Sequence, residues 1–182
     1  MAPASAMPHS IRRPSRMKRL SWLLPCLLWL TTPTWADERL VKPPVSVTWI
    51  SPEKYRDIRS ATGGQKSFEK KVFEALTYYF QDAAEHYLQK GQTLEISVID
   101  LDLAGDVRIN TSGQRIRILT SISSPAISLN YKLLEGETIV KSDKVWLTDL
   151  NYQSSAAGLG HRSPLVYERI MIQRWIQKTF HQ

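Results

Sequence analysis

The segment with the richest side-chain chemistry runs from Thr93 to Asp106 (TLEISVIDLDLAGD). Three of its side chains, Asp100, Asp102 and Asp106, carry hard oxygen donors of the kind that Ca²⁺ and Mg²⁺ prefer. Their spacing lacks the established Ca²⁺-loop pattern and its terminal Glu. Two interpretations follow. The aspartates either form a divalent-ion site that serves a small metal-dependent hydrolase, or they cap a turn and solvate the end of a strand.

The same segment breaks its own hydrophobic pattern. Side chains alternate between the two faces of a regular strand, so the alternation that begins at Leu94 would place Asp100 and Asp102 on the apolar face. The face therefore switches between Val98 and Ile99. Either a β-bulge at this point restores the pattern, or the two carboxylates point toward the core side near the strand end.

Two further residues could act in acid–base chemistry. His161 lies in a Gly-containing loop, but no Gly-x-Ser-x-Gly motif accompanies it, so Ser-His-Asp catalysis has no support. Glu168 stands at the start of a predicted helix, where an acidic side chain is electrostatically favourable. A general-acid role for it needs a partner and a cleft that the sequence does not supply. We expect no catalytic residue and no cofactor, and retain the three aspartates and His161 as candidate binding residues.

The first 36 residues have the pattern of a leader with a cleaved signal peptide, whose proper start is Met17. A basic Met17-Lys18-Arg19 precedes the apolar run Leu20–Leu30, and small residues at Thr34 and Ala36 mark a cleavage site. The apolar run spans 11 residues, whereas a transmembrane helix needs about 20. We therefore expect cleavage near Ala36, a periplasmic or secreted product, and no stable membrane anchor after cleavage.

Cleavage alters the cysteine and charge arguments. Cys26, the single cysteine, lies in the apolar run, so the mature chain would have neither disulfides nor thiolate metal sites. Five of the 24 basic residues and none of the 17 acidic ones precede Asp37, which leaves 19 basic against 17 acidic residues. This near-neutral balance argues against nucleic acid as a partner.

Hydrophobic periodicity predicts the elements that position these groups. Alternating or β-branched segments indicate strands at 45–50, 93–103, 115–118, 127–133 and 138–150. Apolar residues at a spacing of three or four indicate amphipathic helices at 67–89 and 163–180, opened by Ser67 and by Ser163-Pro164.

The resulting order is β-α-β-β-β-β-α in a single α+β domain over residues 45–182, after a mobile lead-in at 37–44. Hairpin links predict a mostly antiparallel sheet of four to five strands with both helices packed on one face. We expect the core to contain Phe68, Val72, Leu76, Phe80, Ile127, Leu129, Tyr131 and Leu133. Trp49, Trp146 and Trp175 are also assigned to the core, and Tyr78 to the surface.

Several motifs occur in one order along the chain. They are PEKY at 52–55, DLDLAG at 100–105, the alternating strand 125–133, Leu147-x-Asp149 ahead of Tyr152, and Leu165-x-Tyr167-Glu168 followed by Trp175 and Phe180. Together they resemble DUF3016, a domain-of-unknown-function family of small secreted Gram-negative proteins. The resemblance covers almost all of the chain after the signal and implies export and a single domain, but it implies no activity.

The sequence therefore favours an exported, non-enzymatic domain that binds an envelope protein or other periplasmic ligand, or helps to maintain the envelope. The alternative is the small metal-dependent hydrolase that uses Asp100, Asp102 and Asp106. The two differ in the geometry they require. An enzyme should show these aspartates or His161 converging on a deep pocket, and a binding module should show a shallow groove or an exposed sheet edge.

Overall fold

The computed structural model describes residues 38–157 and 165–181, which lie in one compact unit of the chain. The expected signal peptide at 1–36 and the candidate residue His161 lie outside the described residues. Within the described part, no helix is long and apolar enough to cross a membrane.

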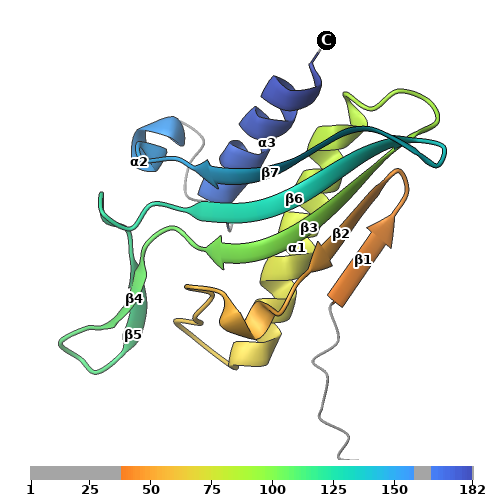
Figure 1. Ribbon diagram of the computed structural model, residues 1–182. Helices are drawn as coiled ribbons and strands as arrows, with labels where there is room; N and C mark the ends of the chain where they lie inside the picture. The colour runs from red at the N-terminus through yellow and green to blue at the C-terminus, as the bar shows by residue number, and fades with distance from the viewer. Residues whose placement is uncertain (1–37, 158–164, 182) are drawn as a thin grey trace, which may run out of the picture. The chain divides into compact units, whose positions relative to one another are not determined.

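A five-stranded sheet forms the body of the domain (Figure 1). Its strands, in spatial order, are β1 (Glu38–Lys42), β2 (Val45–Trp49), β3 (Gln92–Asp102), β6 (Ala126–Glu135) and β7 (Thr138–Thr148). A separate two-stranded hairpin, β4 (Asp106–Ile109) with β5 (Arg115–Ile118), projects from the end of β3 like an arm.

The sheet is mixed rather than wholly antiparallel. All pairs in it are antiparallel except β2 and β3, which run parallel. Parallel neighbours require a crossover connection, and helix α1 (Gln65–Glu85) supplies it. The α+β class and the single domain are confirmed. The predicted order of elements fits only roughly, because it lacks β1, β4 and two short helices.

The segment 37–44 was expected to be a mobile lead-in, but it contains the strand β1. This strand turns at Pro43-Pro44 and pairs antiparallel with β2 along its whole length, from Glu38 opposite Trp49 to Lys42 opposite Val45. A charged segment can pair in this way because the ladder uses backbone groups.

Helices α1 and α3 (Val166–Phe180) lie side by side on one face of the sheet, as predicted (Figure 1). Helix α1 begins at Gln65 with Gly64 as its N-cap, so the expected cap at Ser67 is wrong. The Gln65 side chain instead bonds the backbone of Ser60 and Ile58 and fixes the preceding loop. Ser163-Pro164, the expected start of the last helix, lies outside the described residues.

Two short helices occupy segments in which neither a helix nor a strand was predicted. A 3-10 turn, η1 (Pro52–Lys54), follows β2, and α2 (Tyr152–Ser155) follows β7. Tyr152 of α2 is buried against Tyr167 and donates its hydroxyl to the carbonyl of Thr120. Helix α2 is therefore packed against the start of α3 and the segment after β5.

The core lies between the sheet and the two helices and matches the predicted set, with Phe68 half-buried and the other seven residues buried. Trp49 and Trp175 are buried as expected, and Tyr78 is exposed. The assignment of Trp146 to the core is wrong, because 68% of this residue is exposed. Trp146 pairs with Ser128 in the β6–β7 ladder, which places it on the sheet face opposite helices α1 and α3.

Candidate functional site

A β-bulge in β3 decides where the aspartates point. Val98 pairs with Leu129 and Asp100 with Ser128, so Ile99 is the extra residue. After the bulge Leu101 returns to the core, and the flanking Asp100 and Asp102 project from the opposite, open face. Of the two alternatives that the sequence left open, the structure therefore has the β-bulge, and the carboxylates do not point toward the core.

Arg56 engages both of these carboxylates. Its Nε lies 2.6 Å from Asp100 Oδ2 and its Nη1 lies 3.6 Å from Asp102 Oδ2. The backbone N–H of Arg56 also donates to Asp100 Oδ1 at 3.1 Å. Asp106, the first residue of β4, forms its own ion pair with Arg108, 3.3 Å away on the same strand. All three aspartates are therefore partners of arginines.

The described residues contain no group of three or more His, Cys, Asp or Glu side chains that could hold a metal ion. Asp100 and Asp102 share Arg56 as their ion-pair partner. Burial raises the pKa of Asp102, Arg56 lowers it, and the carboxylates of Asp57, Asp100 and Asp106 raise it further. The geometry of the described residues thus gives no support to the metal-dependent hydrolase.

A second arginine ties the β4–β5 arm to the domain. Arg117 donates through Nη1 to Asp57 Oδ2 at 2.9 Å and to the carbonyl of Gly105 at 2.6 Å. Its Nη2 donates to the carbonyl of Arg59 at 2.9 Å. Because one guanidinium joins three backbone segments, the loop after β2, the end of β3 and the arm are held as one unit.

Glu168 is a titratable residue to which the sequence alone could assign no partner and no cleft. It lies in the first turn of α3, is only 1% exposed, and accepts a 2.8 Å hydrogen bond from the backbone N–H of Ala104. Burial raises the pKa of Glu168, against the opposing effects of that hydrogen bond, of a second one from its own backbone N–H, and of the Arg117 charge. Its spacing from Met171 and Trp175 places it on the apolar stripe of the helix, and that spacing is the signal that could have identified it.

A pocket of about 330 Å³ opens beside this carboxyl group. We call it the α3 pocket. Phe68 of α1, Leu103, Leu119 and the start of α3 form its apolar wall, and Glu168 and Arg117 are its charged residues. The structure therefore supplies both the charged neighbour and the cleft that the sequence could not show for Glu168.

A second feature lies at the other side of the sheet, where β7 forms the edge. Within the described part of the chain, β7 pairs with a strand on one side only. A groove of about 390 Å³, here called the β7 groove, runs between residues 145–149 and helix α3. Met171 and Trp175 line it together with the basic residues Arg174 and Lys178.

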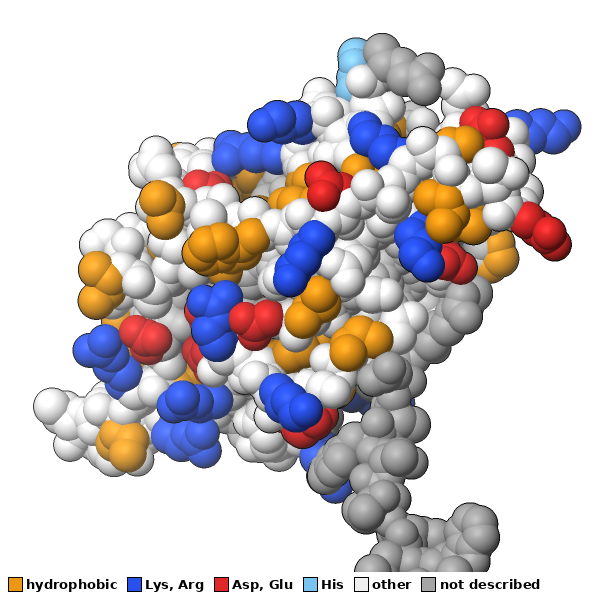
Figure 2. Space-filling view, in the orientation of Figure 1, with side chains coloured by type: hydrophobic (Ala, Val, Ile, Leu, Met, Phe, Trp, Pro, Cys, Tyr) orange, Lys and Arg blue, Asp and Glu red, His pale blue; other side chains and the backbone are white. Residues whose placement is uncertain are grey.

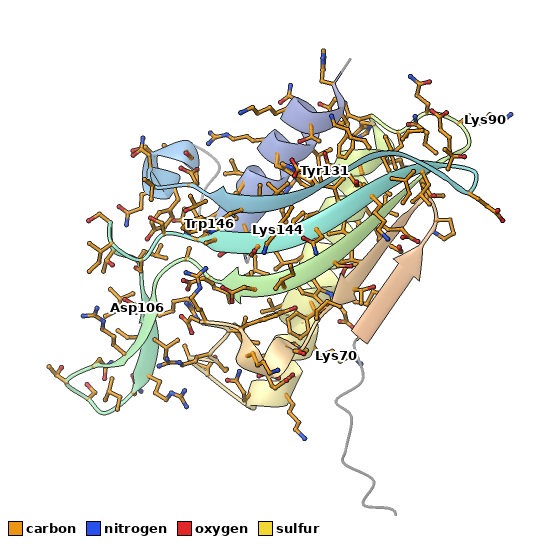
Figure 3. All side chains as sticks on the ribbon, viewed as in Figure 1. Lys70, Lys90, Asp106, Tyr131, Lys144 and Trp146 are labelled. Atoms are coloured by element: carbon orange, nitrogen blue, oxygen red, sulfur yellow. The ribbon has the colours of Figure 1, made fainter. Side chains whose placement is uncertain are left out.

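The open face of the sheet adjoins this edge and mixes apolar with basic side chains (Figure 2). Trp146 and Lys144 stand on it two residues apart on β7 (Figure 3). Arg174 Nη1 lies 3.1 Å from Asp149 Oδ2 and 3.0 Å from Ser155 Oγ, so it is anchored at one end of the groove. The aspartates at the end of β3 are not among the residues that line this groove.

The fold and these sites define a small α+β protein with a mixed sheet and two helices that cover one of its faces. The chain belongs to the family described as protein of unknown function (DUF3016), whose sequence profile matches residues 43–178. This confirms the family that the motifs suggested. No curated protein and no solved structure shows a significant match to the chain.

Proposed function

We propose that this chain is exported, loses its signal near Ala36, and acts as a non-enzymatic binding module of the bacterial envelope. Its partner is an envelope protein that contributes an extended segment along the edge of β7. The observation that supports the proposal is the position of the β7 groove, directly beside a strand edge that has no neighbouring strand among the described residues.

The second half of β7 suits such a segment better than the first. Lys141, in the first half, donates to the carbonyl of Thr179 at 2.7 Å and lies over the Phe180 ring, so the end of α3 engages it. From Val145 to Thr148 the strand has no charged residue. Charged side chains are a common protection of strand edges against pairing, and this stretch has none.

An added strand would gain two kinds of contact at Val145–Thr148. Unpaired N–H and C=O groups of an edge strand can continue the ladder, and pockets beside the edge select alternate side chains. Here the selecting surface is apolar at Met171 and Trp175 and basic at Arg174 and Lys178. With Asp149 as the one acidic residue in the lining, we infer a segment that alternates apolar and acidic residues.

The contacts of the candidate catalytic aspartates favour a binding function over a catalytic one. Asp100 and Asp102 are both engaged by Arg56, and Asp106 by Arg108. A general acid or base must reach the proton that it transfers, and these three carboxylates are engaged by arginines instead. The exposed sheet edge is the feature that we expected of a binding module.

Titration of the purified protein with short synthetic peptides tests this proposal. One peptide alternates valine and glutamate, a second alternates valine and lysine, and a third has the first composition with prolines that prevent strand pairing. We expect only the first to bind, more weakly as salt is added, because partly exposed charges are screened. Lys178→Glu should weaken that binding, and Lys70→Glu, on α1, should not (Figure 3). Equal binding of the three peptides would refute the proposal.

A further inference from the structure

We propose that the α3 pocket is a separate ligand site, which takes a small amphiphile with an apolar, ring-sized body and a hydrogen-bond donor. The donor meets the carboxyl group of Glu168, and the body lies against Leu103, Leu119 and Val166. This site goes beyond the proposed binding at β7, because the α3 pocket and the β7 groove share no lining residue.

The size and wall of the pocket fit a small molecule. Its volume of about 330 Å³ is at the lower end of the range of roughly 300–1,000 Å³ typical of ligand pockets. Apolar side chains from α1, from the end of β3, from the segment after β5 and from α3 converge on it. Water in such a pocket finds few hydrogen-bonding partners, so an apolar body displaces it favourably.

Glu168 has acceptor capacity to spare. A carboxylate offers about four acceptor positions on its two oxygens. The N–H of Ala104 takes one of them at Oε1, and the backbone N–H of Glu168 itself takes another. Arg117 directs its hydrogen bonds to the Asp57 carboxylate and to the carbonyls of Arg59, Ala104 and Gly105. A carboxyl group that is 1% exposed pays a desolvation cost that a ligand donor would offset. The pocket therefore favours ligands that donate a hydrogen bond at this point.

The same groups select against acids. A ligand carboxylate beside Glu168 would bring two like charges together away from water. Arg117 could compensate that charge, but its Nη1 already pairs with Asp57 at 2.9 Å. We therefore infer that amines and alcohols are accepted and that carboxylates with the same apolar body are rejected.

Three probes with one benzyl-sized body test the inference on the purified protein: benzylamine, benzyl alcohol and benzoate. Binding is followed by NMR of the side-chain methyl groups. We expect benzylamine and benzyl alcohol to shift Leu103, Leu119 and Val166, and benzoate to bind at least about tenfold more weakly.

Two variants distinguish a ligand-binding role of the Glu168 carboxyl group from a purely structural role. Glu168→Gln keeps an oxygen for the Ala104 N–H but loses the charge, and should weaken benzylamine about tenfold more than benzyl alcohol. Leu119→Trp should fill the pocket and abolish both. Benzoate binding as tightly as benzylamine, unchanged affinities in Glu168→Gln, or methyl shifts outside the pocket would each overturn the inference. None of these results bears on peptide binding at β7, so the two proposals can fail separately.

Discussion

Gly105→Ala tests the junction that holds the β4–β5 arm and the α3 pocket in place. Gly105 has φ of +80°, and a Cβ added to it would lie 2.5 Å from the carbonyl oxygen of Ile118 and 3.0 Å from its carbon. The positive φ costs an alanine about 1–2 kcal/mol. The contact adds about 1–3 kcal/mol, as overpacking does, because the opposing atoms are backbone. We expect a loss of about 2–5 kcal/mol in the free energy of unfolding.

Gly113→Ala is the matched control. Gly113 has φ of +76°, and its added Cβ would meet nothing within 4 Å. This variant should lose only the conformational contribution of about 1–2 kcal/mol. Urea denaturation of both variants measures the difference, which isolates the contact with Ile118. At about 2–4 °C per kcal/mol for a protein of this size, their melting temperatures should differ by roughly 2–12 °C. Equal losses in the two variants would refute the close approach of β5 to Gly105.

Three further predictions concern the buried carboxyl group, the aspartates and export. Because the pKa of Glu168 is raised in the folded state, its contribution to stability is present at low pH and is lost as pH rises through the folded pKa. The melting temperature of Glu168→Gln relative to the parent should therefore increase from acidic to alkaline pH, and a difference independent of pH would contradict the buried position. Ca²⁺, Mg²⁺, Mn²⁺ and Zn²⁺ should leave the melting temperature unchanged, and Asp102→Asn should cost at most about 1 kcal/mol, as expected for a partly exposed ion pair. A saturable, Asp102-dependent rise would restore the metal-dependent hydrolase. N-terminal sequencing after cell fractionation should find a periplasmic or secreted species that begins near Asp37, and a full-length cytoplasmic product would contradict export.

Local patterns predicted the elements well because each depends on neighbours in the sequence. The alternation from Ile127 to Leu133 predicted β6 and its buried face, and the break at Val98-Ile99 marked the position of the bulge. The face of Trp146 could not be read in this way. Val145 and Leu147 fall on the core side, and the pairing of Trp146 with Ser128 turns it outward.

The candidate site was predicted less completely, for a physical reason. The aspartates stood out as a cluster, but their partner Arg56 is 44 residues from Asp100 in the chain. The α3 pocket depends equally on distant segments, since the Glu168 carboxyl group meets Ala104 from 64 residues away. Parallel pairing of β2 with β3 likewise follows from the path of α1 across the sheet, which strand periodicity does not specify.

The central claim is that a partner segment pairs with the edge of β7, and backbone hydrogen exchange tests it most directly. The valine–glutamate peptide is added at saturation, and amide exchange is followed along both edges of the sheet. We predict slower exchange within Val145–Thr148 and unchanged exchange in β1, the opposite edge. Protection in β1, or no protection in either strand, would contradict the account.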